Sequence, residues 1–206
     1  GVWIRTQGEF HLVSSTSQNH GSDPAGVKTI DASLLNNNDS LAFLGRDLSL
    51  SQLIWSSGIE GLATVIAQSN QHAPGFADGT IFEDLPSSLR ELNFNNADQA
   101  AFVGFVVGPE ASYSQPRNGI WRGTSAEDLG MLIATGSPAP GMVGGERVTS
   151  VTNLLLSDSG EVAFGMFAAP AGVETDGPTR FGIVAGSGPG DFRLVAEFGQ
   201  APGLPE

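Results

Sequence analysis

The chain contains no cysteine among its 206 residues. This absence argues against a thiol enzyme and against a cysteine-ligated zinc site. Secreted eukaryotic domains of this size often carry disulfides, whereas bacterial secreted repeat proteins frequently do without them. The missing cysteines therefore favour a bacterial exported protein.

Positive charge is also scarce. Nine Lys and Arg residues stand against 22 Asp and Glu residues, the formal net charge is −13, and Lys28 is the single lysine. An acidic surface of this kind repels phosphate backbones and anionic lipid headgroups. We therefore expect no nucleic acid among the partners of this chain and no docking on anionic membranes.

Long apolar runs are missing as well. No run approaches the roughly 18 residues that a membrane span needs, although hydrophobic residues make up 40% of the chain and suffice for a core. The chain begins at Gly1 directly on a predicted strand, without a visible signal peptide. We expect any export signal to lie upstream, and the chain to be a piece of something longer.

What the sequence does contain is internal repetition, seen first in strands that end in tryptophan. Such strands lead to Trp3, Trp55 and Trp121, and a degenerate copy leads to Val184. Large side chains recurring in this way are expected to pack between neighbouring units. One short unit cannot cover its own apolar face, so its stability has to come from stacked neighbours.

Two further landmarks recur in the same order. A strand followed by an Ala-Pro-Gly turn ends at Gly75, Gly141 and Gly203, which are 66 (75 to 141) and 62 (141 to 203) residues apart. A polar turn running into Ala-Phe places its phenylalanines at Phe43, Phe102 and Phe164, which are 59 (43 to 102) and 62 (102 to 164) residues apart. We predict tandem repeats of roughly 60 residues.

The whole chain, residues 1–206, is then a single repeat array. The predicted units are repeat 1 at 1–50, repeat 2 at 51–117, repeat 3 at 118–178 and a half-repeat at 179–206. Clusters of Gly, Pro, Asn, Asp and Ser divide each repeat into about four short antiparallel strands. Residues 87–92 resemble a helical turn in isolation, but their counterpart at 148–152 is β-branched, so we predict a strand there.

The fold class that follows is all-β. The strands predicted at 100–107 and 162–168 are apolar on both faces, as expected of strands buried between two sheets. Four-stranded units stacked by large side chains fit a β-propeller with one repeat per blade, and long loops bring each blade to about 60 residues. An open β-solenoid or a sandwich array is the alternative.

The polar turns resemble a family of bacterial surface proteins with tandem N-x-x-G-x-V-A-F repeats and various C-terminal anchors. The motif corresponds to residues 36–43, 95–102 and 157–164. Asp39 and Asp98 stand in the glycine place of the first two copies, and the third keeps Gly160 but has Ser157 in place of the asparagine. The resemblance implies an exported or cell-surface location and a propeller-like fold, and it brings no established activity or catalytic residues.

Catalytic chemistry finds little support. His11, His20 and His72 fall at unrelated points of the repeat, so neither a metal site nor a Ser-His-Asp triad is indicated. Carboxylates such as those at 83–84 and 127–128 are scattered, which favours a solvated acidic face over a glycosidase pair. Residues 186–190 are glycine-rich but lack the phosphate-loop ending, so we predict a hairpin turn. We therefore expect no catalytic residues and no bound cofactor.

Calcium is the metal for which the sequence offers the most suitable ligands. Oxygen ligands lie in corresponding turns at Asn36, Asn38, Asp39, Asn95, Asn96, Asp98, Asp158 and Glu161. Extracellular calcium sites use this chemistry, but no D-x-[DN]-x-[DN]-G loop is present. Turn formation by Asn and Asp is the explanation that we favour.

These observations favour a non-enzymatic extracellular or cell-surface repeat protein that acts in adhesion, matrix building or self-assembly. Its partners are then further copies of itself or an extracellular glycan. A glycan- or ligand-binding β-propeller module is the second hypothesis, and a hydrolase is the third.

Overall fold

The computed structural model describes residues 2–6, 9–14, 27–57, 63–86, 89–109, 117–171 and 180–198. These residues form fifteen strands, with turns and bends between them, and they contain no helix. The strand pairs are antiparallel, and none of the sheets in the described part closes into a barrel. The all-β prediction is confirmed. No described segment forms a helix with the length and apolar character needed to cross a bilayer.

A hairpin and a first sheet make up the N-terminal part. The hairpin pairs β1 (Val2–Thr6) with β2 (Glu9–Ser14). The first sheet has the order β3 (Val27–Leu35), β4 (Leu41–Asp47), β5 (Gln52–Ser57), β6 (Ala63–Gln68).

Two further sheets follow along the chain. The second sheet contains β7 (Ile81–Asp84), β8 (Leu92–Phe94), β9 (Ala100–Val107), β10 (Arg117–Gly123) and β11 (Gly130–Ala134), with β7 and β8 both paired to β9. The third sheet has the order β12 (Glu146–Leu156), β13 (Val162–Pro170), β14 (Arg180–Gly186), β15 (Arg193–Phe198). The glycine-rich residues after β14 form the turn of the β14–β15 hairpin, as predicted.

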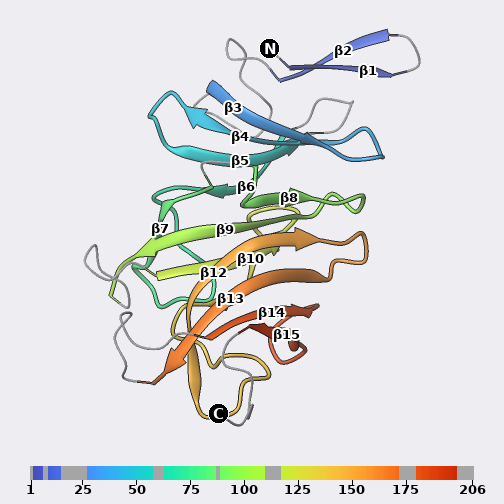
Figure 1. Cartoon of the computed structure of the whole chain (residues 1–206). Helices are drawn as coiled ribbons and strands as arrows, with labels where there is room; N and C mark the ends of the chain where they lie inside the picture. Colours follow the sequence, from blue (N-terminus) through green and yellow to red (C-terminus); the bar gives the residue numbers. More distant parts are fainter. Residues whose placement is uncertain are drawn as a thin grey trace.

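The three sheets lie one after another from the N-terminal to the C-terminal end, with the β1–β2 hairpin beyond the first sheet (Figure 1). One core cluster joins the first and second sheets and includes Ile54 and Phe102, and another joins the second and third sheets and includes Val103 and Phe164. Side chains alternate between the faces of a strand, so β9 sends Phe102 to one neighbouring sheet and Val103 to the other. Its predicted burial between two sheets is confirmed.

The strand β13 differs from β9. Its inward side chains Phe164 and Met166 are at most 1% exposed, but Phe167 on the other face is 38% exposed. The prediction that this strand is buried on both faces is therefore wrong for its outer face. No described sheet covers that face of the third sheet.

The same irregularity recurs in all four hairpins that carry the tryptophan landmark. The register shifts immediately before Trp3, Trp55, Trp121 and Val184. Phe43, Phe102 and Phe164 lie directly opposite Trp55, Trp121 and Val184, respectively. We call residues that share strand and register in this way corresponding residues.

Buried aromatic side chains occupy the interfaces. Trp121 is fully buried against Phe82 and Phe102 at ring-centroid distances of 4.9 and 6.1 Å, in the cluster shared with the first sheet. Trp55 stacks on Phe43 at 5.1 Å, in the cluster on the opposite face of the first sheet. Packing of Trp121 between neighbouring sheets is therefore confirmed, whereas the side chain of Trp3 lies outside the described residues.

The Pro-Gly turns bring successive sheets together. Gly75 and Gly141 have φ angles of 90° and 71°, a region that glycine adopts without steric strain. A Cβ on Gly75 would lie 2.7 Å from Cβ of Met131, and one on Gly141 would lie 2.6 Å from Cβ of Leu194. Each turn thus lies against the last strand of the following sheet. The third landmark, Gly203, lies outside the described residues.

The predicted repeat boundaries fall inside the sheets. The boundary at 50/51 separates β4 from β5, that at 117/118 falls in β10, and that at 178/179 separates β13 from β14. Each sheet therefore combines the end of one predicted repeat with the start of the next.

One predicted strand is wrong. Residues 89–90 form a turn and β8 begins only at Leu92, while residues 87–88 lie outside the described part. Phe82 pairs with Val106 and Leu92 with Phe102, so ten residues of chain span only four positions of β9. The extra residues separate β7 from β8 beside β9. In the third sheet a single unbroken strand, β12, takes the corresponding place.

Candidate functional site

Three polar turns precede β4, β9 and β13, and we call them the turn ladder (residues 36–40, 95–99 and 157–161). Asn36 Oδ1 accepts hydrogen bonds from the main-chain N–H groups of Asn38 and Ser40, both at 2.9 Å. Asn95 Oδ1 accepts from Ala97 and Gln99, both at 3.0 Å. The side-chain oxygen thus closes its own turn, which is the local structure that asparagine favours.

The asparagine amides connect one turn to the next. Asn36 Nδ2 donates to the main-chain oxygen of Asn95 at 2.9 Å, and Asn95 Nδ2 donates to that of Ser157 at 2.8 Å. The main-chain N–H of Asn96 donates to Asp158 Oδ1 at 3.1 Å. Corresponding turns of all three sheets are therefore joined by direct hydrogen bonds.

The fourth position of each turn has a left-handed backbone. Asp39, Asp98 and Gly160 have φ angles of 58°, 56° and 84°. Asn and Asp are the side chains that tolerate this region best after glycine. The predicted tight turns are confirmed, and the aspartates occupy the place of the motif's glycine without a change of backbone conformation.

The calcium candidates lie in these turns, at Asn36, Asn38, Asp39, Asn95, Asn96, Asp98, Asp158 and Glu161. The structure brings the first and second turns together, with Asn36 Nδ2 donating to Asp98 Oδ1 at 2.7 Å. Within the described ranges, no group of three or more His, Cys, Asp or Glu side chains could hold a metal ion. Turn formation and stacking account for the asparagines, and calcium binding stays the alternative that we do not favour.

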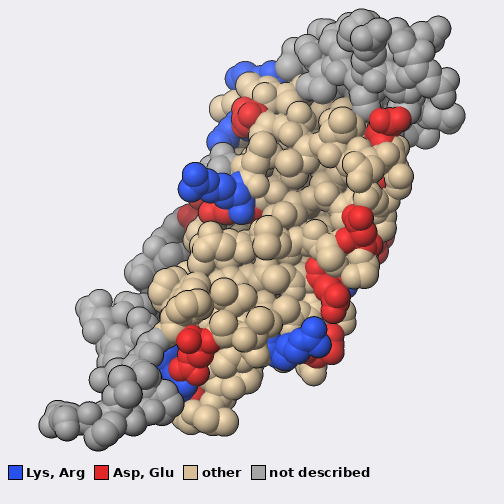
Figure 2. All heavy atoms as spheres, turned by 45° about the vertical axis from the view of Figure 1, so that its right-hand side comes forward, with Lys and Arg blue, Asp and Glu red and all other residues tan. Residues whose placement is uncertain are grey.

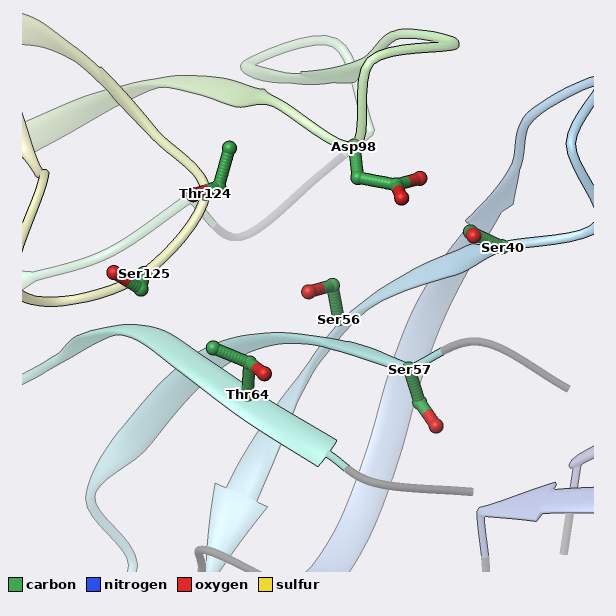
Figure 3. A pocket seen from close by; sticks show the side chains of 7 residues that line it. All are labelled: Ser40, Ser56, Ser57, Thr64, Asp98, Thr124 and Ser125. Carbon is green, nitrogen blue, oxygen red and sulfur yellow. The ribbon is translucent and has the colours of Figure 1, made fainter. Parts of the chain in front are cut away.

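A pocket of about 310 Å³ opens beside the turn ladder, between the first and second sheets. We call it the hydroxyl pocket, and Figure 3 shows the side chains that line it. Its lining consists of Ser40, Ser56, Ser57, Thr64, Asp98, Thr124 and Ser125. Six Ser and Thr residues and one aspartate thus line this space, and sequence analysis did not single it out.

One wall of the hydroxyl pocket is held by Asp128, outside the lining. Asp128 accepts hydrogen bonds from the hydroxyls of Thr124 at 2.8 Å and Ser125 at 3.1 Å and from their main-chain N–H groups. Burial raises the pKa of the Asp128 carboxyl, but these hydrogen bonds outweigh it and hold the pKa below its ordinary value. In the third sheet, the hydroxyl and N–H of Ser187 likewise lower the pKa of Asp191.

A second feature is the outer face of the third sheet. Phe167, Phe181 and Phe198 lie side by side on β13, β14 and β15, with ring-centroid distances of 4.9 and 5.7 Å. Leu155 and Val195 on this sheet are 65% and 60% exposed. We call this surface the aromatic face.

The aromatic row belongs to the third sheet alone. The corresponding residues are Arg46, Gln52 and Ser69 in the first sheet and Phe105, Asn118 and Thr135 in the second. The polar positions of Asn118 and Thr135 thus become aromatic in the sheet whose outer face no described sheet covers. The appearance of Phe181 and Phe198 at these positions is the signal that sequence analysis missed.

The charges on the face seen in Figure 2 do not gather into one patch. Figure 2 shows carboxylates in separate groups over the visible face, with Lys and Arg side chains between them. Arg180, at the edge of the aromatic face, forms ion pairs with Glu146 and Glu197. Hydrogen bonds to Glu197 and Glu146 raise the pKa of Arg180, and the two carboxylates exceed its positive charge by one.

The catalytic candidates considered above do not converge. His72 Nδ1 lies 3.2 Å from the main-chain oxygen of Thr80, and residues 83–84 and 127–128 lie on β7 and after β10. The side chains of His11 and His20 lie outside the described residues. Neither the hydroxyl pocket nor the pocket of about 320 Å³ on the aromatic face is lined by two carboxylates.

A family match covers nearly the whole chain. Residues 1–203 match the family of unknown function DUF7453. No curated protein and no solved structure matches the chain.

Proposed function

The chain belongs to the DUF7453 family of unknown function, and from its geometry we propose that it is a non-enzymatic structural module of the cell surface or extracellular space. It is built from tandem β units and acts in adhesion or matrix building by associating with further copies of itself. The observation that carries this proposal is the aromatic face of the third sheet, which no sheet of the described residues covers.

Tandem construction is supported by the corresponding residues. The register shift before each tryptophan position and the hydrogen bonds from turn to turn relate the sheets to one another at matching positions. Face-to-face packing of four-stranded antiparallel sheets is the arrangement of propeller blades and of open sheet arrays. We propose units of this propeller-like kind, in which a closed ring needs more sheets than the three present here.

Self-association is supported by the way in which the third sheet covers the second. Its residues Ala101, Val103 and Ile120 pack against the third sheet, and the corresponding residues of the third sheet are Ala163, Gly165 and Ile183. The aromatic face therefore corresponds to the face of the second sheet that the third sheet covers, and it carries additional aromatic side chains. A flat sheet of this type is the occupant that we propose.

The net charge of the chain limits which surfaces of two copies can associate. A net charge of −13 makes two copies repel each other over most of their surfaces. The aromatic face has an apolar centre, and Arg180 at its edge is paired with Glu146 and Glu197. Pairing of two such faces about a two-fold axis brings identical apolar surfaces together. The third sheet of a second copy therefore fits best.

Sedimentation velocity over the micromolar to near-millimolar range tests this proposal. The wild-type chain is expected to pass from monomer to dimer with concentration, whereas Val195→Lys and Phe198→Lys stay monomeric because a buried unpaired lysine is strongly unfavourable. Leu48→Lys is the matched control, since Leu48 is 65% exposed in a turn of the first sheet. A wild-type chain that stays monomeric throughout, or a loss of dimer in the control as well, would overturn the proposal.

The extracellular location rests on the acidic surface, the lack of cysteine and the resemblance to bacterial surface proteins. Fractionation of the source cells tests it. The protein is expected in the medium or in the surface fraction, and a purely cytosolic distribution would contradict it.

Glycan binding is the second candidate, and the row of phenylalanine rings is what favours it. Flat aromatic rings cover the apolar faces of sugar rings well, and Asn153 beside Phe181 supplies a polar group for sugar hydroxyls. A glycan array with wild-type protein and Phe181→Ala discriminates the two functions. Binding that depends on Phe181 supports the glycan site, and a blank array leaves self-association as the function of this face.

A further inference from the structure

The hydroxyl pocket has a filled counterpart between the second and third sheets. There Arg122 on β10 reaches across and donates from its guanidinium to the main-chain oxygen of Gly160 in the third polar turn. A Cβ built on Gly160 would lie 2.9 Å from Gln99 Oε1 and 3.5 Å from Arg122 Nη1. The side chains of Arg122 and Gln99 thus occupy the space next to this turn.

Between the first and second sheets the same three positions carry different residues. Ser56 corresponds to Arg122, Ser40 to Gln99 and Asp98 to Gly160. Two long side chains are replaced by two short ones, and a carboxylate is added at the position of the glycine. Protein interfaces otherwise pack as densely as crystals, so the about 310 Å³ of the hydroxyl pocket is the space that the missing side chains leave.

Asp98 brings the one carboxylate of the lining to this space. Asp98 Oδ1 accepts from Asn36 Nδ2 at 2.7 Å, and no described group bonds Asp98 Oδ2. Figure 3 shows Asp98 and Ser40 on one side of the pocket and Thr124 and Ser125 on the other. The Thr124 and Ser125 hydroxyls donate to Asp128, so their oxygens are left with acceptor capacity.

We propose that the hydroxyl pocket binds a guanidinium group, which takes the place that the Arg122 guanidinium takes in the neighbouring interface. A guanidinium presents five N–H donors in one plane and pairs with carboxylates in a fixed geometry. A single carboxylate in a pocket otherwise lined by Ser and Thr residues matches one such monocation. The acidic surface of the chain raises the local concentration of cations and assists its entry.

Titration of the wild-type chain with methylguanidinium chloride, followed by amide chemical shifts, tests the proposal. We expect saturable shifts at Asp98, Thr124 and Ser125, and no saturation with methylammonium chloride, which has the same charge but no planar donor set. The tripeptide Gly-Arg-Gly forms a second arm. Binding of both probes assigns the site to an arginine side chain, and binding of methylguanidinium alone assigns it to a free small molecule.

Two substitutions make the test specific. Asp98→Asn keeps an acceptor for Asn36 and a side chain that tolerates the left-handed backbone, but removes the charge, so we expect the saturable shifts to vanish. Ser56→Arg restores the residue found at position 122, and we expect its guanidinium to fill the pocket, exclude the probe and raise the melting temperature.

Leu48→Arg is the control and is expected to bind like wild type, because Leu48 lies in an exposed turn of the first sheet, outside the pocket lining. Equal binding of methylammonium, unchanged binding by both pocket variants, or no shift at these amides would overturn the proposal. None of these substitutions lies on the aromatic face, so the outcome is independent of self-association.

Discussion

The side-chain amide nitrogen of Asn36 lies 2.9 Å from the main-chain oxygen of Asn95, 59 residues further along the chain. Asn95 repeats this contact with Ser157 at 2.8 Å. Each asparagine thus closes its own turn with its oxygen and holds the next turn with its nitrogen. Ser157 has no side-chain amide, so this pattern of donors stops at the third turn.

Replacing Asn95 by alanine tests how much the turn ladder contributes to stability. Asn95 is 3% exposed. Its loss removes the acceptor of the Ala97 and Gln99 N–H groups and one of the two donors to the Ser157 oxygen, which keeps the N–H of Gly160. We expect the free energy of unfolding to fall by about 2–3 kcal/mol, because unsatisfied buried groups are unfavourable. Urea denaturation followed by circular dichroism measures the change.

Asn38→Ala is the matched control for that substitution. Asn38 donates to the main-chain oxygen of Asn96 at 2.6 Å from an exposed position, where water replaces the lost bond. Its expected loss is below about 1 kcal/mol. Equal losses for the two variants would show that the buried amide has no special role.

The polar turns show which features the sequence predicts and which it does not. The Asn-rich turns and the strands after them follow from local composition, because Asn, Asp and Gly tolerate the backbone at Asp39, Asp98 and Gly160. That the turns stack on one another does not follow from it. The contacts join residues about 60 apart, and only the packing of the sheets decides them.

The arrangement of strands into sheets shows the same limit. The spacing of the landmarks gives the length of the repeat but not the residue at which each sheet begins. The predicted boundaries at 50/51 and 178/179 therefore fall inside sheets. The aromatic row escaped prediction for a related reason. Phe167, Phe181 and Phe198 come together only through the register of three strands.

Acid titration of stability tests the loop that Asp128 holds. The pKa of Asp128 is lowered in the folded chain, so its contribution is present above the unfolded pKa of about 3.9 and is lost as the pH falls through the folded value. Asp128→Asn should lower the melting temperature at neutral pH, and the difference from wild type should shrink in acid.

Thermal melts of both proteins between neutral pH and strong acid provide the comparison. Asp78→Asn, at an exposed position in a loop, is expected to shift the melting temperature little, as most exposed substitutions do. A difference between Asp128→Asn and wild type that stays constant with pH would refute the assignment.

A pair of glycines tests the close packing around β4 within the first sheet. A Cβ on Gly45 would lie 2.1 Å from the main-chain oxygen of Thr29 and 2.9 Å from Cη2 of Trp55. Gly130 has no heavy atom within 4 Å of its Cβ position. We expect Gly45→Ala to lower the free energy of unfolding by about 1–3 kcal/mol or more and Gly130→Ala to be tolerated. Comparable losses in chemical denaturation would contradict the close approach at Gly45.

The two buried tryptophans are expected to differ. Trp121 Nε1 donates to the main-chain oxygen of Pro74 at 2.9 Å, whereas no described group accepts from Trp55 Nε1. Trp121→Phe removes a hydrogen bond as well as volume, so its loss of stability should exceed that of Trp55→Phe by about 1 kcal/mol. Denaturation curves of the two variants give the difference, and a larger loss for Trp55→Phe would contradict it.

Stacking of corresponding turns is tested most directly by scalar couplings across hydrogen bonds in a labelled sample. Correlations are predicted from the side-chain amide of Asn36 to the carbonyl carbon of Asn95 and from that of Asn95 to the carbonyl carbon of Ser157. Side-chain amides without these correlations, exchanging with water as freely as that of an exposed asparagine, would show that the sheets do not stack turn upon turn.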